Sequence, residues 1–350
     1  MREQYMEELK KALEHVNPEI EKEILEDFQA HFEMGLEEGK TEEELAEELG
    51  DPAELAKQLE EEYGRFEKPE TVSERAPEEY EDTEGKIKAI KLDMVVADIT
   101  ISPSTDGVFR VSYENSASGS AFNKRIRYSA HVSGDTFVAR EETAHNSGRC
   151  WASMEIEIPR EFTRLEVEST SGDIEIEGIR VREESEVSTL SGETTIEGLE
   201  TGDLRVRTTS GGIRCEQVKA ATIRTGSISG DLEFEELDCR NFSGETTSGD
   251  ISIEGNVRHA CVCKSISGDC RVSDFRGESL EVATTSGDLE VALGEGTGFT
   301  VLAETMSGDV EMDFGRKESK GFVGAKYRGV IGDGAARVRL KTLSGDIRVE

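Results

Sequence analysis

Most of the chain alternates apolar and polar residues on both sides of a short polar tripeptide, usually Ser-Gly-Asp. The alternation has a period of two, which predicts two short strands per repeat, each with one buried face. Neighbouring copies are mostly about 19 residues apart, within the range of solenoid repeats. Nine copies can be set in register with one another, and their Ser and Gly residues are Ser171, Gly172, Ser191, Gly192, Ser210, Gly211, Ser229, Gly230, Ser248, Gly249, Ser267, Gly268, Ser286, Gly287, Ser307, Gly308, Ser344 and Gly345.

Residue types stay fixed at fixed distances from these turns. In these nine copies a Ser or Thr stands two residues before the tripeptide Ser, and mostly apolar residues stand three and five residues after it. Such columns favour coils stacked in register, with like side chains in ladders ~4.8 Å apart and Gly at a corner where a Cβ would crowd the backbone. An antiparallel sandwich also has alternating strands, but it does not require fixed columns. We therefore predict a mainly β protein with a parallel β-solenoid of roughly 19-residue coils over residues 162–350.

Both ends of the predicted solenoid depart from the period. Residues 86–161 lack the repeat but keep strand-like runs, so we expect an irregular β cap there. The interval between Ser307 and Ser344 is close to two periods, which predicts a degenerate coil around residues 324–334. The sequence stops within a predicted strand, at Glu350. This predicts a free C-terminal edge through which copies of the chain could self-associate.

A different pattern precedes the repeats. From residue 1 to about 64, apolar residues follow a three-to-four spacing, which is typical of amphipathic helices. Two capping boxes, Thr41 with Glu44 and Asp51 with Glu54, mark helix starts. We predict a small four-helix domain whose first two stripes consist of Met6, Leu9, Leu13 and Val16, and of Ile20, Ile24, Phe28, Phe32 and Leu36. Residues 65–85 have many charges and few apolar residues, and we interpret them as a flexible acidic linker, with a further acidic helix as the alternative.

The formal net charge of −35 changes the range of partners. It argues against direct nucleic-acid binding, which depends on clustered Lys and Arg, and against an anionic membrane surface. The charged N-terminus lacks a signal-peptide core, and no stretch reaches the ~18 apolar residues of a transmembrane helix. We expect a cytoplasmic protein, with leaderless export to the surface as the alternative.

The Asp residues of the turns are the first candidates for chemistry. Stacked carboxylates repel, and Ca²⁺ could relieve that repulsion. The candidate ligands are Asp231, Asp250, Asp269, Asp288 and Asp309. Glu193 and Gly212 interrupt the column, and in the competing interpretation Asp accepts backbone N–H bonds within a turn. We prefer the second interpretation and assign no metal and no cofactor.

No catalytic constellation emerges from the remaining residues. Cys261, Cys263 and Cys270 follow the inward alternation, which predicts buried thiols rather than a zinc site. The chain has no phosphate loop, Rossmann fingerprint or nucleophile elbow. A carbohydrate-active β-helix enzyme is the remote alternative, since paired acids could serve acid–base chemistry. We therefore expect a protein that is not an enzyme.

Two segments resemble known families. "TSGDISIEG", "TTSGDLEV" and "YRGVIGDGAARVRLKTLSGDIRV" resemble a bacterial adhesin-type family of β-strand-repeat proteins, classed as a domain of unknown function, over about residues 86–350. "EEGKTEEELAEELGDPAELA" resembles the helix-turn-helix-associated α-helical signalling domain over the first sixty or so residues. The first resemblance implies surface or envelope-stress roles in some members. The second implies association with PadR-type transcriptional regulators.

These observations lead to one functional hypothesis and one alternative. The hypothesis is a non-enzymatic signalling or scaffolding protein. Its helical module binds a protein partner such as a PadR-like regulator, and its solenoid presents an interaction surface to a second protein or envelope component. The alternative is an adhesin-like structural protein at the cell surface.

Overall fold

The computed structural model describes residues 79–115, 126–143, 151–160, 162–314, 316–320 and 324–350, together with isolated positions among the first 41 residues. The chain divides into two compact units, Met1–Ser73 and Glu74–Glu350. In the first unit Leu9 and Phe32 are buried as expected, but the neighbouring buried side chain is Tyr5 rather than Met6. The Tyr5 ring meets Phe32 edge-on, with the ring centroids 5.6 Å apart. The rest of the four-helix prediction lies outside the described residues.

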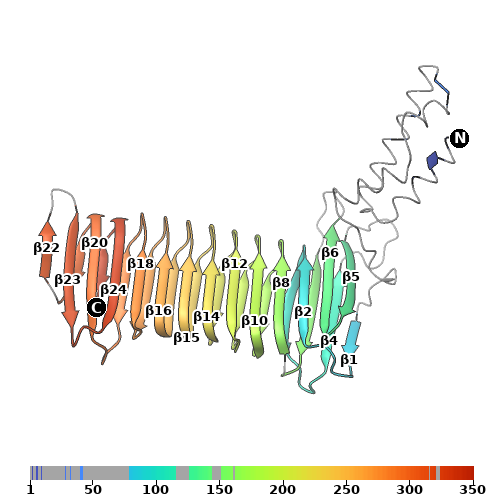
Figure 1. Cartoon of the computed structure of the whole chain (residues 1–350), viewed down its shortest axis with the longest axis horizontal. Helices are drawn as coiled ribbons and strands as arrows, with labels where there is room; N and C mark the ends of the chain where they lie inside the picture. Colours follow the sequence, from blue (N-terminus) through green and yellow to red (C-terminus); the bar gives the residue numbers. More distant parts are fainter. Residues whose placement is uncertain are drawn as a thin grey trace. The chain divides into compact units, whose positions relative to one another are not determined.

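The second unit is a stack of β-coils, which we call the rod (Figure 1). Each coil contributes one strand to each of two facing sheets, face 1 and face 2, and β15 and β16 are long enough to take part in both. In spatial order face 1 consists of β5 (Ile126–Ser133), β6 (Thr136–Thr143), β2 (Ala89–Met94), β8 (Phe162–Ser169), β10 (Val181–Thr189), β12 (Asp203–Thr208), β14 (Lys219–Gly226), β15 (Leu232–Glu245), β16 (Ile251–Lys264), β18 (Ser279–Ala283), β24 (Ala336–Ser344), β20 (Phe299–Ser307), β23 (Ala325–Ile331) and β22 (Arg316–Lys320).

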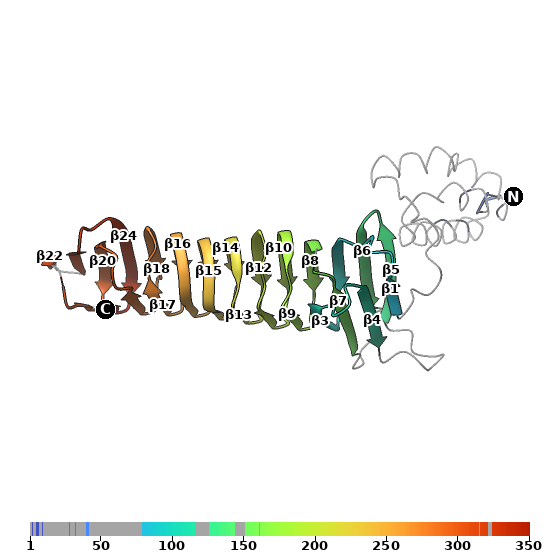
Figure 2. The same cartoon turned by 90° about the horizontal axis from the view of Figure 1, so that it is seen from below.

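Face 2 follows the same coils along the other side of the rod, as the view from below shows (Figure 2). In spatial order it consists of β1 (Glu79–Asp82), β4 (Phe109–Asn115), β7 (Ala152–Ile158), β3 (Ala97–Pro103), β9 (Ile174–Glu177), β11 (Thr194–Glu197), β13 (Ile213–Glu216), the first residues of β15 and β16, β17 (Cys270–Phe275), β19 (Leu289–Leu293), β25 (Ile347–Val349) and β21 (Val310–Met312).

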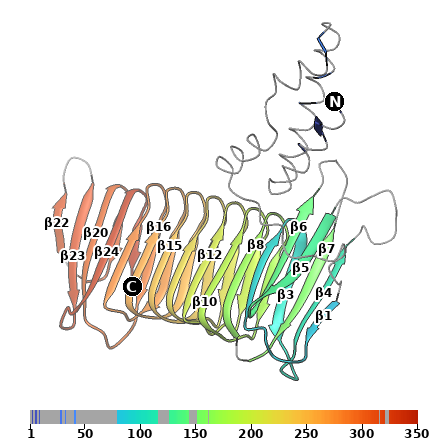
Figure 3. The same cartoon turned by 45° about the vertical axis from the view of Figure 1, so that its right-hand side comes forward.

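Except at the two ends of the rod, the stacked strands are parallel and in register, which confirms the prediction of a mainly β parallel solenoid (Figure 3). The column six residues before each tripeptide Ser shows this directly. Leu204 pairs with Ile223, Ile223 with Phe242, and Phe242 with Cys261. Because each repeat has the same inward alternation, a one-residue slip would turn every apolar side chain to solvent. The pattern of the sequence therefore determines the register.

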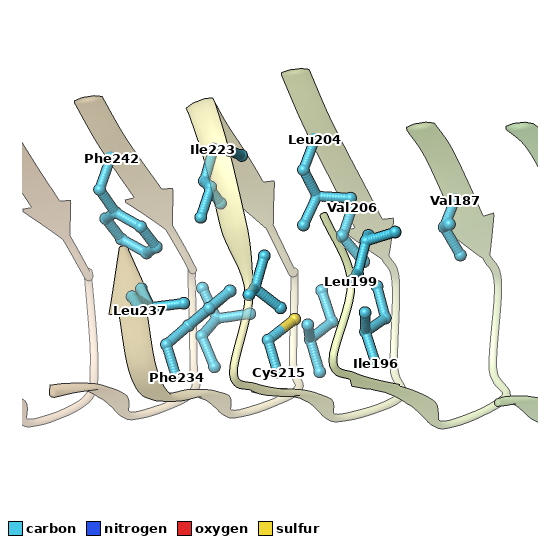
Figure 4. Packing of buried hydrophobic residues seen from close by; sticks show 14 of the residues in the cluster. Val187, Ile196, Leu199, Leu204, Val206, Cys215, Ile223, Phe234, Leu237 and Phe242 are labelled. Carbon is cyan, nitrogen blue, oxygen red and sulfur yellow. The ribbon is translucent and has the colours of Figure 1, made fainter. Parts of the chain in front are cut away.

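Apolar side chains from the two faces meet in the centre of the rod (Figure 4). Leu204, Ile223 and Phe242 point inward from face 1, while Cys215 and Phe234 point inward from face 2, and all five are at most 2 % exposed. The rings of Phe234 and Phe242 meet edge-on with their centroids 4.9 Å apart. One continuous hydrophobic core extends from Ile87 to Val349. Removal of this apolar surface from water is the main force that holds the stack together.

The C-terminal coil lies inside the stack and does not form its end. Leu280 and Val301 both pair with Val338, so β24 lies between β18 and β20. In the same way β25 lies between β19 and β21. Our prediction of a free edge for self-association at the C-terminus is therefore wrong, because both strands of the last coil are already paired on both sides.

The segment expected to form a degenerate coil closes the rod instead. β23 lies within residues 324–334 and runs antiparallel to β20 and β22. The outermost strand β22 has the sequence RKESK. A charged edge strand of this kind disfavours edge-to-edge pairing with other chains. The prediction of a degenerate coil is therefore wrong: the chain leaves the stack, forms an antiparallel pair, and returns to insert its final coil.

The N-terminal end repeats this arrangement in mirror order. Residues 89–103, which we expected to be part of an irregular cap, form a regular coil, with β2 between β6 and β8 and β3 between β7 and β9. The antiparallel strands β1, β4 and β5 are the irregular part. β1 also lies within residues 65–85, so the flexible-linker prediction is wrong for Glu79–Asp82.

In the first coil, which lacks the repeated tripeptide, Glu141 binds the backbone N–H groups at the corner. Its buried carboxylate accepts backbone N–H bonds from Val95 and Val96 at 2.8 Å and from Ala97 at 3.2 Å, and a bond from the Tyr113 hydroxyl at 2.7 Å. Burial, followed by the hydrogen bond to Glu141, raises the pKa of Tyr113 above its ordinary value. A carboxylate from the neighbouring coil thus satisfies the corner amides, as hydroxyl groups do in the later coils.

Candidate interaction surface along the repeat corner

Each coil turns from face 1 to face 2 at the Ser-Gly corner, and the residues there form parallel columns along the rod. We call the position two residues before each tripeptide Ser the recessed column. Its Ser and Thr side chains are buried. The hydroxyl of Thr208 accepts the backbone N–H of Gly211 at 2.9 Å, and the hydroxyl of Thr284 donates to the carbonyl of Gly268 in the preceding coil at 3.1 Å. The hydroxyl groups of the recessed column therefore form hydrogen bonds either within their own turn or to the neighbouring coil.

The tripeptide Gly is required by the close approach of successive coils. A Cβ at Gly211 would lie 1.8 Å from the carbonyl oxygen of Gly192, and one at Gly230 would lie 1.8 Å from that of Gly211. No side chain fits at such distances, so the whole column consists of Gly. The next residue, Gly212, has different surroundings, because its nearest neighbour would be the carbonyl oxygen of Asp231 at 3.9 Å.

The Asp column forms a ladder of hydrogen bonds between coils. Asp250 donates its backbone N–H to the carboxylate of Asp231 at 2.9 Å, and Asp269 donates to Asp250 at 2.8 Å. Asp288 donates to Asp269 at 2.7 Å. The spatial order at the C-terminal end is again Asp288, Asp346, Asp309, with both bonds 2.8 Å long. Each of these carboxylates except the terminal one therefore accepts an N–H from the next coil.

Next to the recessed column runs a line of exposed side chains that we call the ridge, one residue before each tripeptide Ser. In spatial order the ridge consists of Thr170, Leu190, Thr209, Ile228, Thr247, Ile266, Thr285, Leu343 and Met306. Leu190 is 52 % exposed, and Ile228 and Ile266 are each 54 % exposed. Leu343 and Met306 complete the ridge from the last two coils of the rod. Most of the exposed large apolar residues in the described part of the chain thus stand at one position of the repeat.

A groove of about 780 Å³ runs beside the ridge from Ile228 to Leu343. Its floor is the recessed column, and its far side is the position three residues before each tripeptide Ser, which we call the wall. The wall carries Arg207, Glu245, Lys264 and Lys341 along the groove. Lys264 pairs with Glu245 at 3.2 Å. Strand alternation produces this shape, because ridge and wall residues point outward on either side of an inward-pointing hydroxyl.

Charge is unevenly distributed around the rod. On face 2 the outward residues Glu177, Glu197, Glu216 and Glu235 stand in register on successive coils. Arg214 offsets part of this repulsion, through contacts of 3.1 Å to Glu233 and 3.8 Å to Glu235. The groove, with its basic wall, thus contrasts with a face dominated by carboxylates, and like charges along face 2 disfavour acidic partners there.

Comparison with known proteins follows the same division of the chain. A family model described as Toastrack DUF4097 matches residues 87–350. The chain belongs to the Toastrack family. A second family model, HAAS, matches residues 4–58. Both ranges agree with the regions in which the sequence resembles known families.

Two further comparisons add little to this assignment. No curated protein matches the chain. A solved structure described as a candidate cell adhesion protein from Clostridium sporogenes shares 11 % sequence identity and covers 77 % of this chain and 97 % of its own. Its TM-score is 0.22, so no conclusion about fold or function rests on this likeness.

In the Toastrack rod the candidate calcium ligands stand in a column, one on each coil. Asp231, Asp250, Asp269 and Asp288 each use one carboxylate oxygen for the N–H ladder, in which the donor belongs to the adjacent coil and not, as we expected, to the turn of the Asp itself. Asp309 stands at the end of the column, beyond Asp346. Among the described residues, no group of three or more His, Cys, Asp and Glu side chains is arranged to hold a metal ion.

The cysteines of the Toastrack rod are buried free thiols, as predicted for Cys261, Cys263 and Cys270. The Sγ atoms of Cys261 and Cys263 are 3.8 Å apart. The hydrogen bond between these two thiols, together with burial, raises the pKa of Cys263, and burial raises the pKa of Cys270 to about 12. Thiols held protonated in this way are poor nucleophiles and poor metal ligands. Cys150 lies outside the described residues.

The ridge is the feature of this Toastrack protein that sequence reasoning missed. Its signal was present in the sequence, since the residue before each tripeptide Ser alternates between Thr and a large aliphatic residue from Thr170 to Thr285. The spatial order, in which Leu343 follows Thr285, could not be read from the sequence because it depends on the inserted C-terminal coil. Within the described residues no helix is long and apolar enough to span a membrane.

Proposed function

We propose that this protein is a non-enzymatic signalling or scaffolding protein with two binding parts. In this proposal the helical module binds a protein partner, a PadR-like transcriptional regulator, and the rod presents a long interaction surface to a second protein or envelope component. The observation that carries the proposal is the division of the chain. A HAAS match covers residues 4–58, and a separate Toastrack unit has its own hydrophobic core.

The chemistry of the rod supports a binding role rather than catalysis. Its buried thiols have raised pKa values, and its turn carboxylates are engaged in backbone hydrogen bonds. The ridge and the groove beside it instead present one chemical pattern over many coils. A repeated surface of this kind suits an extended partner, because an aliphatic ridge residue recurs on every second coil.

Affinity capture from native extract tests the two-part assignment. The full chain is compared with the rod alone, a chain that lacks residues 1–73, since the rod contains its own core. We expect the full chain to enrich a helix-turn-helix regulator, identified by mass spectrometry, and the rod alone to lose it. Equal enrichment by both chains, or none by either, would contradict the proposal.

We also propose that the protein is cytoplasmic, and cell fractionation tests this location. We expect the protein in the cytosolic fraction, protected from protease added to intact cells. Cleavage of the rod on intact cells would favour the alternative, an adhesin-like surface protein.

A further inference from the structure

We propose that the groove along the repeat corner binds an acidic segment of polypeptide in the polyproline II conformation, with an apolar residue at every third position. The inference rests on the proposed role of the rod as an interaction surface, and it names the site and the chemistry of the partner. Three features carry it: the spacing of the ridge, the charge of the wall, and the hydrogen bonds of the recessed column.

The spacing of the ridge matches one type of regular backbone. Ile228, Ile266 and Leu343 line the groove on every second coil, with Thr in the coils between, and Leu190 continues the same spacing beyond the groove. At about 4.8 Å per coil, an aliphatic side chain recurs about every 9.6 Å. A polyproline II helix has three residues per turn and a rise of about 3.1 Å, so it repeats every ~9.3 Å. Over three intervals the difference grows to only about 1 Å.

Other backbones fit this spacing less well. Side chains on one side of an extended strand recur every ~6.7 Å, which does not match one or two coils. Two turns of an α-helix advance about 10.8 Å, so a helix would move out of step by more than 3 Å over the same length. The ridge therefore discriminates between partner conformations through the coil spacing alone.

The wall adds a preference for negative charge. Arg207 and Lys341 are exposed and form no ion pair within the described residues, while Lys264 is paired with the one acidic wall residue of the groove, Glu245. The wall along the groove is thus locally basic in a chain with a net charge of −35. A second copy of this chain would bring the same large negative charge, so an acidic segment short enough to lie in the groove is the better electrostatic match.

The hydrogen bonds of the recessed column complete the argument. Its hydroxyl groups are used within the rod, as in the bonds from Thr284 to Gly268 and from Thr342 to Gly287. The floor therefore offers few free groups to a strand, which needs partners for its backbone. A polyproline II segment has no internal hydrogen bonds and keeps its backbone hydrated, so it can lie in the groove without burying unpaired polar groups.

Fluorescence anisotropy with the full chain tests the inference. The probe is a labelled peptide of four Pro-Glu-Leu repeats, and the control peptide has the same composition in scrambled order. We expect the repeat peptide to bind at least tenfold more tightly than the scrambled one, and its binding to weaken with added salt. Equal binding of the two peptides, or no binding, would overturn the inference.

Ridge variants locate the site. Ile228→Thr with Ile266→Thr places at two ridge positions the residue that already stands there in alternate coils, so the fold is expected to tolerate both changes. Peptide binding should weaken about tenfold. The matched control is Val330→Thr, an exposed apolar residue outside the ridge, which should bind like the unchanged chain. Unchanged binding by the ridge variant would overturn the inference.

The outcomes also separate this inference from the proposed function. If the full chain captures its regulator but no peptide binds, the groove inference is wrong and the two-part assignment stands. If the peptide binds but no regulator is captured, the groove inference stands and the two-part assignment is wrong. A dimer in sedimentation experiments that is lost in the ridge variant would assign the ridge to a second copy of the chain and overturn the inference.

Discussion

The recessed column and the ridge are adjacent positions of the same repeat, yet they obey different rules. Every coil with the tripeptide has Ser or Thr in the recessed column, where the hydroxyl bonds to the turn Gly or to the neighbouring coil. In the ridge, Thr alternates with Leu or Ile from Thr170 to Leu343, and no requirement of the backbone explains the alternation. The comparison suggests that one column serves stability and the other serves recognition.

The largest expected loss of stability follows from substitution of a tripeptide Gly, whose N–H is bound by the recessed column. Gly211→Ala would bring a Cβ to 1.8 Å from a carbonyl oxygen of the adjacent coil, so we expect it to lower the free energy of unfolding by about 3 kcal/mol or more. Gly212→Ala is the matched control, because its Cβ would meet nothing closer than 3.9 Å. Urea denaturation measures the free energy of unfolding of both variants. A similar loss of stability in both would show that the short distance between coils at Gly211 does not require Gly.

A smaller effect is expected within the recessed column itself. Thr208→Val removes the acceptor of the Gly211 N–H and leaves that buried group unpaired, which should cost about 2 kcal/mol. Thr194→Val is expected to have the opposite effect on stability, because the Thr194 hydroxyl is buried without a hydrogen-bond partner. Its replacement by a methyl group should stabilise the rod by about 1 kcal/mol. If both variants were equally destabilised, hydrogen bonding would not be what distinguishes the two positions.

The thiol beneath the Asp column gives a pH test of the same corner. Burial first, and then the charges of Asp250 and Asp269, raise the pKa of Cys270 to about 12 from an ordinary value near 9. Above pH 9 the unfolded chain loses the Cys270 thiol proton, while the folded chain keeps it. The contribution of this thiol to the free energy of unfolding is therefore complete below pH 9 and is lost as the pH rises to 12. At pH 10 the loss is about 1 kcal/mol.

Denaturation of Cys270→Ala as a function of pH isolates this contribution. Its free energy of unfolding should fall less steeply above pH 9 than that of the unchanged chain. Parallel curves for the two proteins would mean that the thiol is not held protonated by the fold.

The repeats specify much of the architecture because local pattern and packing agree. Fixed columns predicted the parallel register, the buried apolar positions and the Gly corner, but not that each Asp accepts an N–H from the adjacent coil. What they could not predict is which coil stacks on which at the ends of the rod. β24 carries the repeat signature but returns to insert between β18 and β20, a choice made by long-range packing rather than by the repeat itself.

The first coil shows a second limit of sequence reasoning. Residues 89–103 lack the Ser-Gly pair, and a buried carboxylate from another coil, that of Glu141, replaces the missing hydroxyl. A search for sequence repeats cannot detect that a carboxylate replaces a hydroxyl as the hydrogen-bond acceptor. The ridge was missed for a related reason, because an alternation over two coils is weaker than a column with one residue type.

The aliphatic residues of the ridge contribute little to the stability of the rod. Chemical denaturation of the triple variant Leu190→Thr, Ile228→Thr and Ile266→Thr tests this most directly. Because these side chains are about half exposed and Thr occupies the same column in other coils, the free energy of unfolding should stay within about 1 kcal/mol of the unchanged chain. A loss of several kcal/mol, comparable to that of Gly211→Ala, would show that the aliphatic residues are part of the structural core and would contradict the account.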